Sequence, residues 1–172
     1  MKTNIHTQVI HDIISSEGLY PNNNHLPFLI YKNAVDYRNA STKDVTGFLK
    51  NNHWYKAWVN GIYNFHHYHS NTHEVLLIYS GKKLIQIGGD NGKIYEIEKG
   101  DVIFLPAGVS HKSVGTNISF CCIGAYPYNI DYDMNYGRTS EHPQVAQNIK
   151  HVKLPKHDPI FGKRGPLFKY WK

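Results

Sequence analysis

A run of short, β-branched segments between Trp54 and Tyr128 constrains the fold more than any other feature of the sequence. "LIQIGG" (84–89), "KIYEIE" (93–98) and "DVIFLP" (101–106) are separated by turns that contain Gly, Pro, Asn and Asp. The "DNG" turn supplies residues that tolerate positive φ, so residues 84–98 are predicted to form a β-hairpin. Because many short strands follow one another without intervening helices, the pattern favours an all-β sandwich or barrel over a parallel α/β sheet.

Helix signals lie in the segments that flank this run. In "STKDVTGFLKNN" (41–52), Ser41 or Thr42 can cap a helix and Asp44 falls in its first turn. "SEHPQVAQNIKHV" (140–152) predicts a second short helix, with Pro143 in its first turn. The remaining tail, 154–171, is expected to wrap back over the domain as a loop. We therefore expect one or two short helices at the periphery of a β fold.

The length and charge of the chain narrow its class and its partners. At 172 residues the chain is long enough for one domain with a real core. Its formal charge is +6, but the basic residues concentrate only in 150–172, which matches no nucleic-acid module and reads as a solvated edge. No apolar run approaches the roughly 18 residues of a membrane span, and the first residues lack signal-peptide features. We expect a soluble, cytoplasmic protein that binds neither nucleic acid nor a membrane.

Both cysteines are neighbours, Cys121 and Cys122, in the predicted strand 118–127. A disulfide between adjacent residues needs a strained ring, and alternation along a strand sends the two side chains to opposite faces. No CxxC spacing is present. We therefore interpret them as two small apolar residues, one inside and one packed outside.

Four histidines and one glutamate lie within residues 61–81, "GIYNFHHYHSNTHEVLLIYSG", a stretch that is otherwise largely apolar and β-branched. His67 and His69 are two apart in a predicted strand, so both imidazoles should leave the same face, roughly 6.5–7 Å apart. After the turn "SNT", Glu74 opens the predicted return strand of a hairpin, which would bring its carboxylate to the end that carries the histidines. His111 follows a Pro-Gly turn on another strand.

Three imidazoles and one carboxylate on rigid strands predict a site for one divalent transition metal. The predicted ligands are His67, His69, His111 and Glu74, with one or two positions left for water or substrate. The mixed nitrogen and oxygen set favours iron or manganese, and nickel, zinc and cobalt also suit it.

The spacing of these residues also forms two motifs. G-x5-H-x-H-x4-E-x6-G is matched at every fixed position, by Gly61, His67, His69, Glu74 and Gly81. The second motif, G-x5-P-x-G-x2-H-x3-N, is matched by Gly100, Pro106, Gly108 and His111. Its last letter is not matched, because Gly115 stands in place of Asn. In these motifs the chain resembles the cupin superfamily. Further blocks, such as "LYPNNNHLPFLIYKNAV" and "DPIFGKRGPL", resemble a group of small bacterial single-domain cupins of unassigned function.

The resemblance implies a jelly-roll β-barrel, a metal near its mouth and, commonly, a homodimer. It also implies one cupin domain over residues 1–172. Within it we expect an extended N-terminal arm and short helix (1–53), the motif core (54–128) and a C-terminal helix with a wrap-around loop (129–172). No reaction follows from the resemblance, because cupins run oxygenation, isomerisation, epimerisation and decarboxylation, and some only bind.

Two residues are candidates for contact with a substrate. Tyr63 and Phe65 share strand parity with the predicted ligands and should line the barrel, Phe65 as core packing and Tyr63 as either core or a substrate contact. Gln86 lies among aliphatic residues and is either an outward-facing side chain or a pocket group. Tyr63 and Gln86 are thus the catalytic candidates.

Four other polar residues near the motifs have structural explanations. His66 has the opposite parity to His67 and should point outward, to the surface or a dimer contact. His73 either orients the Glu74 carboxylate or is a turn histidine. Lys112 should point away from the site, and Asp101 is expected to cap a turn.

The residues leave three hypotheses for function. The first is a metal-dependent enzyme, of oxygenase or isomerase type, whose small polar substrate chelates the metal, such as a sugar derivative, an oxo or hydroxy acid, or a catechol-like ring. The alternative is a non-catalytic, metal-containing protein that binds or senses a small ligand. The third is a scaffold with a vestigial site. This hypothesis is disfavoured because all four ligand positions of the motifs are occupied by the expected residues.

Overall fold

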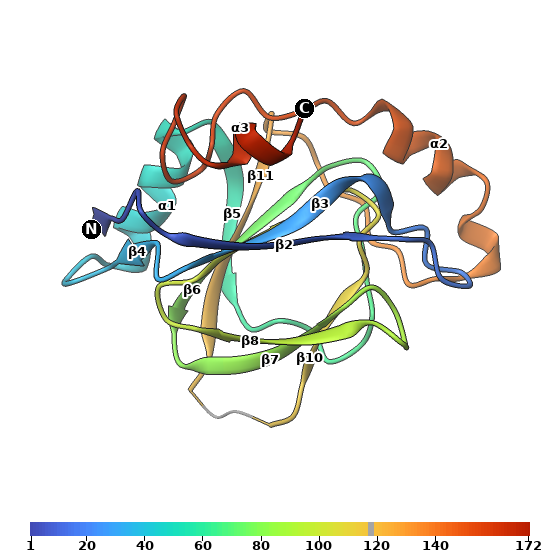
Figure 1. The fold of residues 1–172 in the computed structure, drawn as a ribbon, viewed down its shortest axis with the longest axis horizontal. Coiled ribbons are helices and arrows are strands. Elements are labelled where there is room, and N and C mark those ends of the chain that lie inside the picture. Colours follow the sequence, from blue (N-terminus) through green and yellow to red (C-terminus); the bar gives the residue numbers. More distant parts are fainter. Residues whose placement is uncertain (117–118) are drawn as a thin grey trace.

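The computed structural model describes residues 1–116 and 119–172 and shows two facing antiparallel β-sheets (Figure 1). The larger sheet has six strands, in the order β2 (Gln8–Ile14), β3 (Asn23–Lys32), β9 (Val102–Leu105), β6 (Glu74–Ser80), β11 (Cys121–Pro127) and β5 (Trp54–Asn60). The smaller sheet has three, in the order β10 (His111–Val114), β7 (Lys82–Ile87) and β8 (Lys93–Glu98). Two short strands, β1 (Lys2–Thr3) and β4 (Val35–Asp36), pair separately.

Apart from the consecutive pair β2 and β3, neighbouring strands in the large sheet come from distant parts of the chain, as in a jelly roll, so the predicted all-β fold is confirmed. The predicted hairpin is also confirmed, because β7 and β8 pair from Lys82↔Glu98 to Ile87↔Lys93. The buried strand predicted at 101–106 is β9, all four residues of which are buried. Ile118, the first residue of the predicted strand 118–127, lies outside the described residues; the rest of that prediction corresponds to β11.

Short helices lie at the periphery of the sheets. They are α1 (Thr42–Asn51), the 3-10 helix η1 (Thr139–Glu141), α2 (Gln144–His151) and α3 (Leu167–Tyr170). The predicted cap of α1 is confirmed, because Ser41 and Asp44 form a reciprocal capping box. The tail was predicted to be loop, but it contains α3, whose Leu167 is fully buried. Tertiary packing, rather than local propensity, stabilises so short a helix.

The large sheet is buried on both faces. One face packs against the small sheet, through Phe28, Ile30, Leu76, Ile78, Ile103 and Ile85. The other face lies under α1 and the C-terminal tail, through Leu29, Tyr31, Val75, Leu77, Phe104, Leu49 and Trp171 (Figure 1). This explains why the sequences of β3, β6 and β9 are continuous apolar runs instead of alternating ones. Burial of both faces also holds the backbone of β6 in place, and the first residue of β6 is Glu74.

The segment between β5 and β6 is not the strand that the sequence predicts. Within 61–73, His67 forms an isolated bridge with His111 and Tyr68 forms one with Asn135. Glu74 therefore does not return along a hairpin, because β6 pairs with β9 and β11 instead. The two hydrogen bonds between the backbones of His67 and His111, of 3.2 and 3.0 Å, nevertheless fasten this segment to the start of β10.

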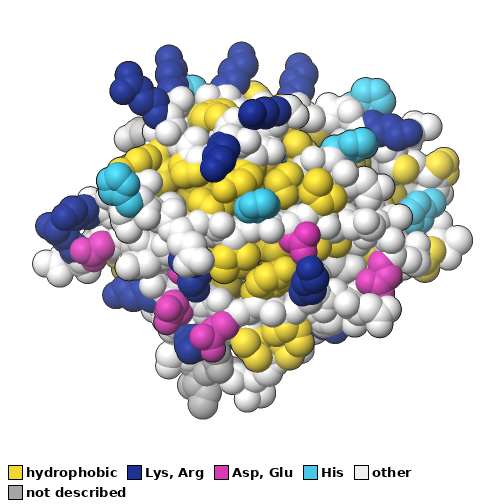
Figure 2. Space-filling view, in the orientation of Figure 1, with side chains coloured by type: hydrophobic (Ala, Val, Ile, Leu, Met, Phe, Trp, Pro, Cys, Tyr) yellow, Lys and Arg dark blue, Asp and Glu magenta, His cyan; other side chains and the backbone are white. Residues whose placement is uncertain are grey.

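The surface agrees with the interpretation of the basic tail. Figure 2 shows Lys and Arg side chains standing out along the upper edge, where the C-terminal segment runs in Figure 1. Cys122 is buried, Cys121 is partly exposed and both are free thiols, as predicted. In the described part of the chain, no helix has both the length and the apolar character that crossing a membrane requires.

Candidate functional site

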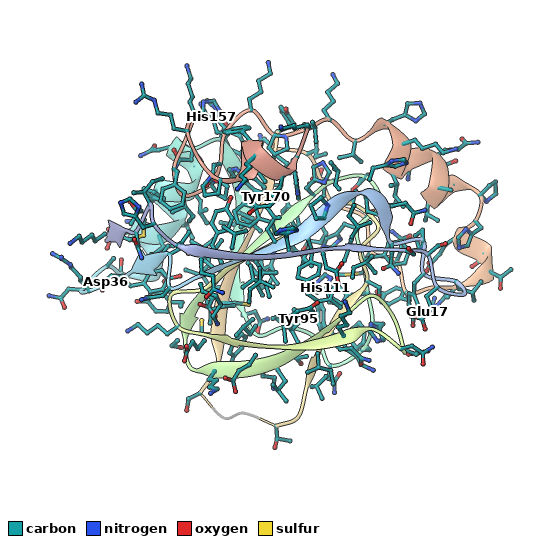
Figure 3. The ribbon with its side chains drawn as sticks, in the orientation of Figure 1. Glu17, Asp36, Tyr95, His111, His157 and Tyr170 are labelled. Atoms are coloured by element: carbon teal, nitrogen blue, oxygen red, sulfur yellow. The ribbon has the colours of Figure 1, made fainter. Side chains whose placement is uncertain are left out.

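Four predicted ligand residues meet between the two sheets, where the start of β6, the start of β10 and the 61–73 segment converge. Nε2 of His69 lies 3.5 Å from Oε1 of Glu74, and Nε2 of His111 lies 3.5 Å from Oε2 of the same carboxylate. The rings of His67 and His111 are 4.2 Å apart. All four side chains are buried, at 5% exposure or less, and Figure 3 shows His111 in the interior between the sheets.

A backbone carbonyl orients each of the three imidazoles. Nδ1 of His67 lies 3.2 Å from the carbonyl oxygen of Phe65, and Nδ1 of His111 lies 3.2 Å from that of Val109. Nδ1 of His69 bonds the carbonyl of Asp133. Because a carbonyl can only accept, Nδ1 carries the proton in each ring, and Nε2 of the neutral ring is left with its lone pair available.

The Glu74 carboxylate is held on one side and unsatisfied on the other. Tyr126 donates a 2.8 Å hydrogen bond from its hydroxyl to Oε1, and Trp58 donates from Nε1 to the Tyr126 hydroxyl, also at 2.8 Å. Oε2 is buried and has no hydrogen-bond partner. A buried, unpaired carboxylate oxygen costs free energy, unless a cation or a proton shares the space between it and the imidazoles.

Gly124 makes this arrangement of Trp58 and Tyr126 feasible. A Cβ at residue 124 would lie 2.2 Å from the Trp58 indole, far inside van der Waals contact. The absence of a side chain on β11 therefore lets the indole lie against the strand and reach the Tyr126 hydroxyl.

Electrostatics separates the four groups by their affinity for a proton. Burial disfavours the ionised form of Glu74. The charge and hydrogen bond of His69, with smaller contributions from His111 and His67, outweigh burial and lower the pKa of Glu74 to about 2. Burial, and then His67, lower the pKa of His111 to about 3, and burial lowers that of His67. Burial also opposes a charge on His69, yet Glu74 raises its pKa above the usual value. At neutral pH the carboxylate is thus ionised and His69 is the imidazole that most readily takes a proton.

The four donors do not yet surround a common point. Among the described residues, no group of three or more His, Cys, Asp and Glu side chains could hold a metal ion in its present arrangement. Binding of an ion by the four predicted ligands would therefore require their side chains to move from positions in which the two Nε2–Oε separations are 3.5 Å.

A cavity of about 170 Å³ opens onto these four side chains. Its wall is formed mostly by aromatic and aliphatic residues, which include Trp58, Ile62, Tyr63, Leu76, Tyr126, Tyr132 and Met134. Tyr63, a catalytic candidate, lines the cavity with its ring 5.2 Å from that of His67 and is half exposed.

Other predictions about this region are wrong because the 61–69 segment lacks the alternation of a strand. Phe65 is 43% exposed and stacks on Tyr63 at 4.8 Å, so it is not core packing. His66 does not point outward; it is buried, with Nδ1 3.0 Å from the Ser110 hydroxyl oxygen and its ring 5.2 Å from that of Tyr20.

The remaining candidates lie away from the cavity. Gln86 donates to the carbonyls of Asp90 and Gly92, at 2.9 and 3.1 Å, and so closes the β7–β8 turn. His73 is buried, accepts a 3.0 Å bond from the amide of Ala107 at Nδ1 and packs against Trp171. It is a structural histidine instead of a partner for the Glu74 carboxylate. Asp101 caps its turn as predicted, by accepting from the amides of Asn33 and Glu98.

Sequence reasoning missed the residues that support and enclose the site. Tyr126, Trp58, Tyr132 and Met134 carry no motif letter. A signal existed for Tyr126, because Cys122, Gly124 and Tyr126 share one face of β11 by alternation. Nothing in the local pattern marks Tyr132, which stacks on Tyr126 with ring centres 4.4 Å apart.

Comparison with known proteins gives one close relative. The chain is 37% identical over 155 residues to YjlB of Bacillus subtilis strain 168, an uncharacterised protein, and the match covers 90% of this chain and 92% of YjlB. No protein-family model matches the chain.

Similar solved structures share less than a fifth of their residues with this chain. Procruciferin, an 11S globulin of Brassica napus, is 16% identical with a TM-score of 0.38, over 65% of this chain and 23% of that one. Acireductone dioxygenase of Bacillus anthracis, with cadmium in its active centre, is 19% identical with a TM-score of 0.38, over 51% and 60%. A deletion mutant of oxalate decarboxylase OxdC from Bacillus subtilis is 19% identical with a TM-score of 0.40, over 73% and 30%.

These TM-scores are too low to carry any argument about activity. The evidence for kinship is instead the match to YjlB along nearly the whole of both chains. The evidence for the fold is the pair of antiparallel sheets, with His67, His69 and Glu74 of the first motif and His111 of the second lining one cavity between them. The chain therefore belongs to the family of YjlB, and it is a cupin.

Proposed function

We propose that this cupin is a metal-dependent enzyme, of oxygenase or isomerase type, whose small substrate chelates the metal. The observation that carries the proposal is the shared orientation of three buried imidazoles, each tied to a carbonyl through Nδ1, around a carboxylate with an unpartnered buried oxygen. Neutral imidazole nitrogens and a carboxylate oxygen are the donor set that first-row divalent metals prefer. Nothing else in the described part of the site would satisfy Glu74 Oε2.

His67, His69, His111 and Glu74 would hold the ion, with iron or manganese favoured by the donor set. A bound divalent ion would supply Lewis-acid chemistry to a substrate oxygen, or redox chemistry if it is iron. Tyr126 would keep Oε1 of Glu74 occupied, so that Oε2 is the oxygen presented to the cavity. Burial raises the pKa of the Tyr126 hydroxyl, so it remains a donor throughout the physiological range.

The cavity wall would bind and orient the substrate and exclude water. Trp58, Tyr132 and Tyr63 lie around the same cavity as the four ligands, and Tyr63 is the residue best placed to contact a substrate that enters from solvent. Gln86 has no part in this function, because its amide is engaged in the β7–β8 turn.

The proposal is tested by loading the purified chain with iron(II) or manganese(II) and measuring bound metal by elemental mass spectrometry. Turnover and oxygen uptake are then followed with oxo acids, hydroxy acids, sugar derivatives and catechols. About one ion per chain and conversion of at least one class would support the proposal. An absence of bound metal, or bound metal with no conversion of any class, would contradict it. His111→Ala serves as the metal-free control.

Non-catalytic binding of a small ligand is the second candidate. It is favoured by the described lining of the cavity, which holds no Lys, Asp or second Glu that could transfer protons alongside the four ligands. Thermal stabilisation of the metal-loaded chain by a compound that is recovered unchanged would favour this function over catalysis.

We also propose a homodimer in the cytoplasm. The outermost strands β2 and β8 expose Ile13 and Ile94, at 49% and 54%, and sheet edges of this kind are commonly covered by another chain. Light scattering coupled to gel filtration would give the mass of the particle, and a mass of one chain would refute the dimer.

A further inference from the structure

The wall of the cavity has a chemical character that narrows the substrate. Beside the four donors, eight of its described lining residues are aromatic or aliphatic: Trp58, Val59, Ile62, Tyr63, Leu76, Tyr126, Tyr132 and Met134. Tyr126 and Tyr132 stack with their planes 26° apart, and Tyr132 lies 4.8 Å from the ring of His69. A flat apolar body would gain most from such a wall.

The volume of the cavity limits the size of that body. It measures about 170 Å³, before any ion is placed in it. A protein cavity of about 150 Å³ lined by apolar side chains holds one benzene molecule. The enclosed part of the ligand is therefore of the size of a single ring or smaller.

Charge excludes a second anionic group. Glu74 is the one acidic side chain among the described residues that line the cavity, and no Lys or Arg is among them. A carboxylate or phosphate buried here, beyond the one that binds the ion, would have no cation to pair with, and burial of an unpaired charge is costly.

Three hydrogen-bonding groups of the wall are already engaged within the protein. The Tyr126 hydroxyl donates to Glu74 and accepts from Trp58 Nε1, and Asn60 Oδ1 accepts from the amide of Gly61. A ligand rich in hydroxyl groups would leave several of them unpaired on burial.

From these features we propose that the ligand is a compact, flat and mostly apolar molecule, of single-ring size, with one chelating end and no second anionic group. A catechol, or an oxo acid that carries a small apolar group, fits this class, whereas sugar phosphates and dicarboxylates do not. The inference rests on the proposed function, because the chelating end is defined by the ion.

Matched hydroxamates test it, since they share one chelating end and differ only in the body attached to it. Acetohydroxamate, benzohydroxamate and 4-carboxybenzohydroxamate are titrated by calorimetry into the manganese-loaded chain, whose metal content is measured on the same samples. We expect benzohydroxamate to bind at least about tenfold more tightly than acetohydroxamate, because the ring is buried. The 4-carboxy compound should bind at least about tenfold more weakly than benzohydroxamate.

Two variants locate the effect in the wall. Tyr132 is 40% exposed and Val59, another lining residue, is 45% exposed, so substitution of either should leave the fold intact. Tyr132→Ala should reduce the preference for the ring and leave acetohydroxamate binding unchanged. Val59→Arg adds a cation to the lining and should strengthen binding of the 4-carboxy compound.

The outcomes separate the two proposals. If the chain binds no metal, the proposed function fails, and the chelating end fails with it. If metal is bound but acetohydroxamate binds as tightly as benzohydroxamate, or the 4-carboxy compound binds as tightly as its parent, the inference about the substrate is wrong and the metal site stands.

Discussion

Five buried histidines near the site fall into two groups that differ in how their rings are held. In the cavity group (His67, His69 and His111), Nδ1 faces a backbone carbonyl and Nε2 is directed towards the cavity. In the enclosed group (His66 and His73), the rings are engaged inside the protein. Nδ1 of His73 accepts from a backbone amide, which requires the opposite tautomer to that of the cavity group, and Nδ1 of His66 meets a serine hydroxyl.

The difference shows that the groups around a ring, and not its position in the sequence, determine whether a histidine presents Nε2 to the cavity or is held inside the protein. His66 and His67 are adjacent and both buried, at 7% and 5% exposure, yet they belong to different groups. The predictions below test this division by changing one member at a time.

Loss of a cavity histidine should have the largest effect. His111→Ala removes one of the nitrogen donors, so we expect manganese(II) affinity to fall more than about 100-fold, beyond the 10–100-fold that loss of an outer partner causes. Calorimetry and elemental mass spectrometry give the affinity and the stoichiometry. His66→Gln, from the enclosed group, is the control and should bind manganese as the parent chain does. Equal metal loss in both variants would erase the distinction between the groups.

Loss of an enclosed histidine should affect stability instead of metal binding. His73→Ala leaves the Ala107 amide unpaired and a space beside Trp171, so the free energy of unfolding should fall by about 2–4 kcal/mol. Urea denaturation of the metal-free chain measures this change. Metal stoichiometry should stay at that of the parent; a variant that unfolds normally but no longer binds metal would place His73 in the cavity group.

Tyr126 tests whether the carboxylate, like the imidazoles, needs support. Tyr126→Phe removes the donor to Glu74 Oε1 and keeps the ring, so we expect manganese affinity to fall about tenfold. Tyr132→Phe is the matched control, since it keeps the ring that stacks on Tyr126. An unchanged affinity in Tyr126→Phe would mean that packing alone holds Glu74.

The proton affinities of the cavity group predict a pH dependence of metal binding. Glu74 has a pKa of about 2 and stays ionised. His111, with a pKa of about 3, and His67, whose pKa is also lowered, stay neutral. The pKa of His69 is instead raised above its usual value. An ion must therefore displace one proton, from His69, when the pH is below that raised pKa. Manganese affinity should fall by at most about tenfold per pH unit on acidification, and level off at high pH. Calorimetry in buffers of different ionisation enthalpy counts the proton. Release of two or more protons would show that His67 or His111 is also charged in the free chain.

The sequence allowed the fold and the ligand residues to be predicted for a physical reason. Residue spacing fixes which side chains can meet when strands are short and turns are marked by Gly and Pro, as in the β7–β8 hairpin. The prediction is wrong for residues 61–69, because it assumes the alternation of a strand where only isolated bridges form. Phe65 is therefore predicted to be buried and His66 exposed, whereas Phe65 is exposed and His66 is buried. The supporting pair Trp58 and Tyr126 depends on contacts across β5 and β11, which no local pattern encodes.

The carbonyls that orient the imidazoles have a consequence for how the protein can evolve. Phe65 and Val109 bond Nδ1 of His67 and His111 through main-chain oxygen atoms, and every amino acid possesses that oxygen. Substitutions at the exposed position 65 can therefore accumulate without removing the bond that orients His67, as long as the path of the backbone is kept, whereas Val109 is also held by its place in the core. Lineages that diverge in what they bind can in this way remodel the entrance while inheriting the same imidazole geometry.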